Sequence, residues 1–509
     1  MRKQFKRLLC GILTGLVTAT SLVLPASAEE PYNVYNYDRW GEAIPSQSGY
    51  LAQQSILGSN LEFNGKSIGD FSSPNDIFKD ANDTFYLVDS GNNRIVVLNS
   101  TLDTVLDIYD TFTGLDGKET TLSNPTGIWV DSDEGYMYIA DNKNSRVIKC
   151  DMNLNVVLEF TKPTSEVYSQ KLSFLPQKVL VDTAGYVYIV VNNITSGAVM
   201  FNSNGEFQGF YGANKVKETA EVISNYMWNL IATDEMRARR SKSVPVGFNN
   251  FDLDDEGFIY TCTQSSETDI IKKVNPAGDN LFEGLDVVWG DDTTNIDTTK
   301  TVSICDIDVS EDGYINCLDS TTGRVFQYDA ECNLMFVIGT KADQMGGFKQ
   351  VSAIESMGTN LYVVDSLKNT ITVFGETEFG SIVHQATDLY NSGYYEDALE
   401  PWREVLKRDG NYRNAYIGIA NAQLNAGEYE ESMKYSKLAD NGKIYNKAFE
   451  GYRQNWIDAH FNLIAFIVIL LIVLWFADTI LKKKKNTTVF TIVKQAIQSK
   501  LPKRKGSKS

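Results

Sequence analysis

The sequence predicts a multidomain chain: an all-β six-bladed propeller, then an α-helical repeat array, one transmembrane helix and a basic tail. Three observations predict this order. A pair of short strands joined by a tight turn, which usually holds an acid and a glycine, recurs six times between about residues 70 and 375. A helical pattern then recurs at an offset of 34 residues. Finally, a 21-residue apolar segment, 461–481, is followed directly by four lysines.

Residues 1–28 have the organisation of a secretory signal peptide. A basic segment, 2–7, precedes an apolar stretch, and Ala26-Ser27-Ala28 forms an A-x-A cleavage pattern. We therefore expect the mature chain to begin at Glu29. The alternative reading of the same stretch is an uncleaved N-terminal anchor.

The propeller is predicted from six copies of one strand–turn–strand unit. Each copy has a short strand ending in an acid or a serine, a tight turn that usually holds glycine, and an aromatic and β-branched strand. The copies lie near residues 78–89, 129–141, 180–189, 252–260, 307–315 and 360–365. Units of this length with several short strands are typical of a propeller. We expect the segment 32–65 to supply the strand that closes the ring.

Two of these units carry a recognisable motif. The segments 89–95 (Asp-Ser-Gly-Asn-Asn-Arg-Ile) and 141–147 (Asp-Asn-Lys-Asn-Ser-Arg-Val), with Pro125-Thr126-Gly127-Ile128 before the second, resemble NHL repeats. Proteins of that family fold as six-bladed propellers, so the resemblance implies an NHL-like propeller over residues 29–377. Units 3 and 4 depart from the motif, because Val191 and Thr263 replace the acid.

The acid and the arginine of this motif recur in three units. We interpret Asp89/Arg94, Asp141/Arg146 and Asp319/Arg324 as structural ion pairs that tie hairpin turns.

A longer gap between units, about 213–247, has apolar residues at helical spacing and then four basic residues in an otherwise acidic domain. We expect an inserted helix there. Its basic end is either a solvated helix terminus or part of a lid or docking element on one propeller face.

The region 378–460 carries the helical repeat. Ala386, Gly393, Tyr395 and Ala398 return 34 residues later as Ala420, Gly427, Tyr429 and Ser432. This period resembles tetratricopeptide (TPR) repeats. We expect helices near 380–391, 395–408, 412–425 and 428–440, and a further helix from Lys443 into the apolar segment. The resemblance implies docking of other proteins; a plain spacer is the alternative.

The apolar segment 461–481 is long enough to cross a membrane. At ~1.5 Å per residue it spans about 31 Å. The lysines at 482–485 predict a cytoplasmic side for the tail 482–509, and the signal peptide predicts an outer side for residues 29–460. The tail is either a helix lying on anionic lipid or an unstructured stop-transfer segment.

Charge excludes one class of partner. The chain has a net charge of −18, with 47 basic and 65 acidic residues. Fourteen of the basic residues lie at the two ends, 1–28 and 482–509, which hold no acid. Because the body between them would repel phosphates, we expect no nucleic-acid binding.

Catalytic residues are scarce. The two histidines, His384 and His460, lie outside the predicted propeller, so the channel lacks histidine for catalysis or zinc binding. Some propellers related to the NHL family are zinc- and histidine-dependent lyases, and this chain lacks those ligands. The sequence thus predicts no catalytic residues and no required cofactor.

Candidate ligand-binding residues come from counting back to the start of each inner strand. This places Asp76, Lys178, Asn250 and Asp306 at the mouth of the channel. Two carboxylates and an amide could hold Ca²⁺, which prefers oxygen ligands. Such a site would resemble the metal centre of six-bladed lactonases, and this resemblance implies the alternative function, a Ca²⁺-dependent hydrolase or lactonase. Exposed tyrosines and tryptophans beside acids could stack on sugars, although we expect most of these rings to pack between blades. Four propeller tryptophans are the first candidates: Trp40, Trp129, Trp228 and Trp289.

The sequence favours a non-catalytic protein of a bacterial cell membrane. We expect the propeller to bind a glycan or a protein outside the cell. We expect the helical repeat to dock other membrane or cell-surface proteins, such as a membrane transport complex. Membrane lipid is expected to contact the anchor and the basic tail.

Overall fold

The computed structural model describes residues 32, 34–38, 41–214, 246–264, 269–285, 287–291, 302–485 and 487–500. The predicted signal peptide and almost all of the predicted helical insertion lie outside these residues, as do Trp40 and Trp228. The chain divides into two compact units. The first runs to Asp388 and includes Arg403–Asn414, and the second contains Leu389–Trp402 and Ala415 onwards.

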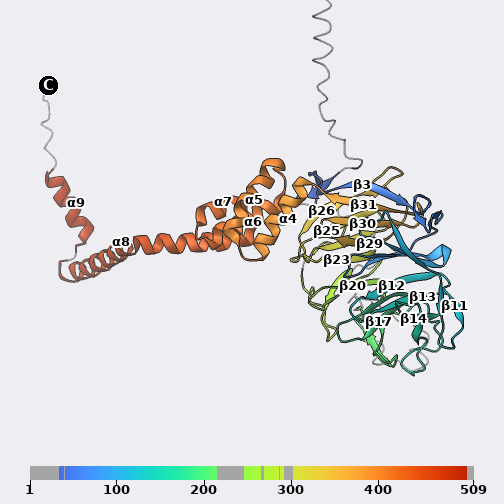
Figure 1. Cartoon of the computed structure of the whole chain (residues 1–509). Helices are drawn as coiled ribbons and strands as arrows, with labels where there is room; N and C mark the ends of the chain where they lie inside the picture. The colour runs from blue at the N-terminus through green and yellow to red at the C-terminus, as the bar shows by residue number, and fades with distance from the viewer. Residues whose placement is uncertain are drawn as a thin grey trace, which may run out of the picture. The chain divides into compact units, whose positions relative to one another are not determined.

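Six sheets in the described residues confirm the predicted six-bladed propeller (Figure 1). Each sheet is antiparallel and its strands follow one another outward from the channel. Blade 1 contains β6 (Asp76–Lys79), β7 (Phe85–Asp89), β8 (Arg94–Leu98) and β9 (Val105–Tyr109). Blade 2 contains β12 (Pro125–Asp131), β13 (Tyr136–Asp141), β14 (Arg146–Asp151) and β15 (Val156–Phe160). Blade 3 contains β16 (Pro176–Val181), β17 (Val187–Val191), β18 (Ala198–Phe201) and β19 (Phe207–Tyr211).

The remaining blades follow the same order. Blade 4 shows three strands in the described residues, β20 (Asn250–Leu253), β21 (Ile259–Cys262) and β22 (Ile271–Val274). Blade 5 contains β23 (Ile304–Val309), β24 (Ile315–Asp319), β25 (Arg324–Tyr328) and β26 (Leu334–Ile338). Blade 6 contains β29 (Val351–Met357), β30 (Asn360–Asp365), β31 (Thr370–Glu376) and β3 (Tyr50–Leu57). Four short pairs decorate the blades: β1 (Tyr35–Tyr37) with β2 (Ala43–Pro45), β4 (Glu62–Phe63) with β5 (Lys66–Ser67), β10 (Thr111–Thr113) with β11 (Glu119–Thr121), and β27 (Thr340–Lys341) with β28 (Gly347–Phe348).

Strand β3 closes the ring, as predicted for the segment 32–65. It comes from the N-terminal side of all other blade strands, yet it pairs with β31 from Tyr50↔Glu376 to Leu57↔Thr370. The outermost strand of blade 6 is therefore the first blade strand of the chain. This pairing joins the two ends of the propeller sequence.

The core lies between neighbouring blades. Alternate side chains of each strand face the adjacent sheet, so aromatic and β-branched residues of two blades interleave. The Phe85 ring of blade 1 and the Tyr362 ring of blade 6 have centroids 4.6 Å apart, and Phe85 is fully buried. Burial of these apolar faces holds the blades side by side.

Two of the three predicted ion pairs form. Arg94 Nε lies 2.8 Å from Asp89 Oδ2, and Arg146 Nε lies 3.0 Å from Asp141 Oδ2. The third prediction is wrong: Arg324 Nη1 pairs with Asp291 Oδ2 at 2.8 Å. Asp319 instead accepts hydrogen bonds from the backbone of Ser303 and the hydroxyl of Thr322, which satisfy this buried carboxylate without the arginine.

Helices follow the propeller. They are α4 (Glu378–Asn391), α5 (Tyr395–Arg408), α6 (Arg413–Asn425) and α7 (Tyr429–Leu438), each within two residues of its predicted bounds. The turn after α4 and the turn after α6 are built alike. Gly393 and Gly427 both have positive φ, 83° and 77°, which favours glycine. The N–H groups of Gly393 and Gly427 donate to carbonyls three residues earlier, those of Tyr390 and Leu424. The 34-residue sequence repeat is thus also a repeat of local structure.

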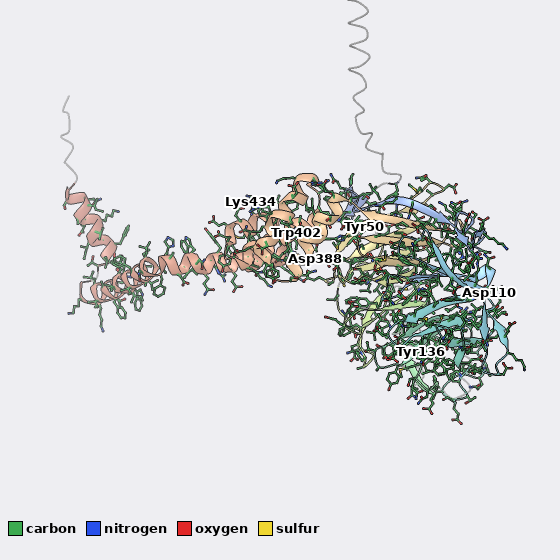
Figure 2. The ribbon with its side chains drawn as sticks, viewed as in Figure 1. Tyr50, Asp110, Tyr136, Asp388, Trp402 and Lys434 are labelled. Atoms are coloured by element: carbon green, nitrogen blue, oxygen red, sulfur yellow. The ribbon has the colours of Figure 1, made fainter. Side chains whose placement is uncertain are left out.

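Within the first unit, α4 packs against blades 5 and 6. His384 is 9% exposed, and its ring hydrogen-bonds to Gln327 at 2.9 Å and to Glu376. The Tyr314 hydroxyl donates to Asp388, and the Tyr50 ring lies 5.9 Å from that of His384. Tyr50 and Asp388 are labelled in Figure 2. Because β31 leads directly into α4, these contacts hold the start of α4 against the blades within the first unit.

The last helices are α8 (Gly442–Lys485) and α9 (Val489–Lys500). Helix α8 contains the whole predicted span 461–481 and begins next to the predicted residue, Lys443. The most apolar 18-residue stretch of α8 has a mean hydropathy of 2.8. Among the helices that the structure describes, α8 is long enough and apolar enough to cross a membrane. The apolar side chains of that stretch are exposed, which fits a membrane anchor.

Candidate functional site

The four predicted mouth residues come together at the centre of the ring. Asp76 and Asn250 open their inner strands, β6 and β20. Lys178 and Asp306 lie near the start of β16 and β23, each directly after a shift in strand register. Such a bulge re-aims a side chain, here toward the channel axis. Counting to equal depth in repeated units therefore located a real cluster, which we call the central cluster.

The central cluster is held by charge-assisted hydrogen bonds. Lys178 Nζ contacts Asp76 Oδ1 and lies 3.9 Å from Asp306 Oδ1. Asn250 Nδ2 donates to the same Asp306 oxygen. The backbone N–H of Ile128 donates to Asp76 Oδ2 at 3.0 Å, and that of Ile354 donates to Asp306 Oδ2 at 2.7 Å.

These contacts join all six blades. Asp76, Ile128 and Lys178 belong to blades 1, 2 and 3, and Asn250, Asp306 and Ile354 belong to blades 4, 5 and 6. Asp76, Asn250 and Asp306 are each 2–3% exposed. The central cluster therefore closes the channel, and its carboxylates are used in holding the ring together.

Blade 2 leaves room for the lysine. Its residue at the equivalent depth is Gly127, and a Cβ there would lie 2.7 Å from the Gln177 carbonyl oxygen and 2.9 Å from Lys178 Cα. A contact that short with backbone atoms forces a shift. Gly127 thus allows β12 and β16 to approach closely beside the Lys178 stem.

Burial and charge set the protonation of the central cluster. Burial raises the pKa of Asp306 to about 7, although Lys178 opposes this. Burial also raises the pKa of Asp76 above its usual range, again against the effect of Lys178. Burial alone would lower the pKa of Lys178, but Asp306 and Asp76 outweigh it, and the net shift is upward. The ammonium therefore stays charged at neutral pH.

A second carboxyl layer lies below the central cluster. Asp252, Asp308 and Glu355 line a cavity of about 40 Å³ that Asp76, Lys178 and Asp306 also border. Burial raises the pKa of all three carboxyls, and mutual repulsion adds to the shift at Asp252 and Glu355. Asp252 and Asp308 accept backbone N–H groups of the next blade, from Val309 at 2.7 Å and Ser356 at 3.0 Å. The arrangement repeats, one layer down, the way Asp76 and Asp306 tie neighbouring blades.

Above the central cluster, the mouth is a depression of about 790 Å³. Its lining is rich in amides, and those that the structure describes are Asn75, Gln177, Asn192, Asn193, Asn249, Asn250, Gln264 and Gln350. Among the described lining residues, Lys178 carries the positive charge, and Ser320, Ser352 and Ser366 contribute hydroxyl groups. Neutral donors and acceptors of this kind suit the hydroxyl or amide groups of a polar ligand.

Most of these amides are not predicted by the strand pattern in the sequence. Asn75, Gln177 and Asn249 each directly precede a residue that was predicted, Asp76, Lys178 or Asn250. Shifting the count by one residue would have found them. The other amides come from loops, which the strand pattern does not place.

The central cluster does not fit Ca²⁺. Asp76, Asn250 and Asp306 converge as a metal site requires, but the Lys178 ammonium contacts Asp76 and faces Asp306 between the two carboxylates. A dication there would have to displace that ammonium or lie against it. Among the described residues, no group of three or more His, Cys, Asp and Glu side chains is placed to hold a metal ion.

The fold and the site define a six-bladed β-propeller protein with a closed channel, an amide-lined mouth and a C-terminal helical region. No family model matches the chain. No curated protein matches it either.

Solved structures with which the chain can be aligned include two lyases and an extracellular domain. A streptogramin B lyase structure is 10% identical, with 64% of this chain and 98% of that chain covered and a TM-score of 0.39. A catalytically inactive virginiamycin B lyase from Staphylococcus aureus with quinupristin is 10% identical, with 69% and 97% covered and a TM-score of 0.38. The extracellular domain of a putative one-component system from B. thetaiotaomicron is 9% identical, with 62% and 33% covered and a TM-score of 0.35. Likenesses this distant say nothing of activity.

Proposed function

We propose that this chain is a membrane-anchored binding and scaffold protein whose propeller holds a ligand at the amide-lined mouth. The observation that supports it is the 790 Å³ depression above a channel floor closed by the central cluster. The floor groups are hydrogen-bonded to one another and to backbone, so the surface offered to a ligand is one for recognition. Neutral amides and hydroxyls suit a glycan or a protein segment.

A catalytic role has less support. The pKa of Asp306 is raised to about 7, a value that would suit an acid or a base. Both of its oxygens, however, accept hydrogen bonds from Asn250 and Ile354, and the side chain is buried. We therefore do not favour the Ca²⁺-dependent hydrolase, which would also need Lys178 to leave its position.

The helical region is proposed to dock a second protein. Its two helix–turn–helix pairs repeat at 34 residues with the same glycine turn, which supports the TPR-like interpretation. TPR-like arrays dock protein segments, and we infer a membrane or cell-surface partner, such as a transport complex. Tyr394, 60% exposed in the turn between α4 and α5, is a candidate contact, because exposed aromatic side chains often anchor interfaces.

The proposed topology is that of a single-pass protein of a bacterial cell membrane. Residues 29–460 would lie outside and 482–509 inside, with 461–481 in the bilayer. The exposed apolar segment of α8 and the four lysines at the C-terminal end of that helix support this orientation. In the same proposal, the Asp–Arg pairs of blades 1 and 2 support an NHL-like propeller.

Filling the mouth tests the ligand site. Gln350 is exposed in the mouth, and Gln208 is also exposed, on the outer strand of blade 3. We expect full-length Gln350→Trp to lose at least about tenfold in affinity for its glycan or protein ligand, found by glycan array or by crosslinking in its own membranes. Gln208→Trp should bind as wild type. Equal binding by both variants would refute the mouth as the ligand site.

Co-purification from its own membranes tests the docking role. The Tyr394→Ala variant should lose partners that wild type retains, whereas Tyr186→Ala, on the propeller, should keep them. Retention of the same partners by Tyr394→Ala would remove the support that this side chain gives to the proposal.

A further inference from the structure

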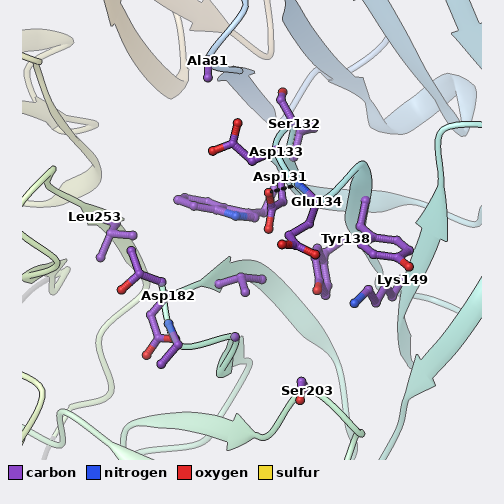
Figure 3. A pocket seen from close by; sticks show the side chains of 17 residues that line it. Ala81, Asp131, Ser132, Asp133, Glu134, Tyr138, Lys149, Asp182, Ser203 and Leu253 are labelled. Atoms are coloured by element: carbon purple, nitrogen blue, oxygen red, sulfur yellow. Dashed lines mark hydrogen bonds between the residues drawn. The ribbon is translucent and has the colours of Figure 1, made fainter.

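A second pocket lies at the other end of the blades from the mouth. It has a volume of about 620 Å³ and is bordered by the ends of inner strands β12 and β16 and by the turns that follow them (Figure 3). The mouth, in contrast, is bordered by the starts of the inner strands. The mouth and this pocket therefore lie at opposite ends of the inner strands, with the central cluster between them.

Aromatic rings form one part of the lining. Trp129, Tyr136 and Tyr138 come from β12 and β13 of blade 2. The centroid of the Phe78 ring, on blade 1, lies 5.0 Å from that of Trp129, on blade 2. This contact supports the indole of Trp129, which remains partly exposed. Of the two predicted tryptophans that the structure describes, Trp129 borders a pocket, whereas Trp289 is buried against Tyr328.

Carboxylates form the other part. Asp131 ends β12, Asp133 and Glu134 lie in the turn that follows it, and Asp182 lies just after β16. Figure 3 shows the Asp133 and Asp182 side chains on different sides of the pocket. Asp131 accepts the N–H of Glu134 at 2.9 Å, and Asp182 accepts the Tyr188 hydroxyl at 2.9 Å. These bonds hold the two carboxylates in fixed positions before any ligand arrives.

The pocket already holds one ammonium group against a ring. Lys149 Nζ lies 3.9 Å from the centroid of the Tyr136 ring, a cation–π contact. Burial lowers the pKa of Lys149, and Asp131 and Glu134 oppose that shift. Against four carboxylates this single ammonium leaves the lining with a net negative charge.

We propose that this pocket binds a saccharide that carries a free amino group. An indole beside fixed carboxylates offers an apolar face to a sugar ring and acceptors to its hydroxyls. The excess of carboxylates attracts a protonated amine, and the rings stabilise it as Tyr136 does for Lys149. The site lies apart from the mouth, so this ligand is additional to the one in the proposed function.

Titration calorimetry of the full chain, in a detergent without a sugar headgroup, tests the proposal with three probes. They are the glucosamine tetramer, the fully N-acetylated tetramer and spermine. We expect the glucosamine tetramer to bind at least about tenfold more tightly than the acetylated one, and spermine to bind more weakly than the glucosamine tetramer. Equal affinity for the two tetramers would refute the requirement for a free amino group. Equal affinity for spermine and the glucosamine tetramer would refute the requirement for a sugar ring. Failure of the glucosamine tetramer to bind overturns the proposal as a whole.

Variants test the location. Asp133 and Glu134 are exposed, so the double variant Asp133→Asn/Glu134→Gln should fold normally. We expect this variant to bind the glucosamine tetramer about threefold to tenfold more weakly, because an interaction with an exposed charge contributes modestly to affinity. The matched control is Asp255→Asn/Glu256→Gln, the same turn of blade 4, which should bind as wild type. Unchanged affinity in the first variant, or loss of the tetramer in the mouth variant Gln350→Trp, overturns this location.

Discussion

Replacement of Lys178 by methionine tests whether the central cluster ties the ring. Methionine keeps most of the side-chain volume and removes the charge. Asp76 and Asp306, both 3% exposed, would then face each other without a cation. Removing one partner of a buried ion pair costs about 3–5 kcal/mol of unfolding free energy. Because one ammonium serves two carboxylates here, we expect a loss near the upper end.

The assay is thermal unfolding of the full chain in detergent, followed by tryptophan fluorescence. At about 2–4 °C per kcal/mol, the expected loss lowers Tm by about 10 °C or more at pH 8. The deficit should shrink as pH falls toward 5, because the orphaned carboxyls then bind protons in the folded state. Lys171→Met, at an exposed lysine just before β16, is the control. A Tm of Lys178→Met within about 2 °C of wild type would refute the reasoning.

Further predictions concern the same ring. Since the folded-state pKa of Glu355 is raised, its proton stabilises the fold at low pH and this stability is lost as pH rises, so Glu355→Gln should raise Tm relative to wild type more at pH 8 than at pH 5. Gly127→Val should lower the free energy of unfolding by about 1–3 kcal/mol, measured by denaturant titration, because its Cβ meets the backbone of blade 3. Arg146→Met should destabilise more than Arg324→Met in the same titration, because Arg146 serves the fully buried Asp141 and Arg324 a partly exposed acid. Millimolar Ca²⁺ and EDTA should each leave Tm unchanged, and a rise of several degrees with Ca²⁺ would contradict the fit of Lys178 to this position.

The blades could be predicted from sequence because their determinants are local. An acid or a serine, usually with a glycine, sets each inner turn, and alternation of apolar residues marks the strands beside it. The central cluster could be predicted for a related reason. In a ring of repeated units, residues at equal offsets lie at equal depth, so counting back from the turns reached Asp76, Lys178, Asn250 and Asp306.

What the sequence did not predict depends on contacts between distant segments. The position of Lys178 between two carboxylates follows from its reach across the channel, which no local pattern encodes. Arg324 pairs with Asp291, which precedes blade 5, in place of the acid in its own motif. The acidic aromatic pocket likewise needs two blades side by side, because Trp129 and Asp182 border it from different units.

The pairing of β3 with β31 has a consequence for the order of assembly. Because synthesis starts at the N-terminus, β3 (Tyr50–Leu57) is made long before its pairing partner β31 (Thr370–Glu376). Until then the sixth blade has no outer edge, and an unpaired strand remains open to aggregation. Folding of the whole propeller therefore waits for its last strand. In a fragment that lacks Thr370–Glu376, β3 would remain an unpaired strand that can pair with other chains.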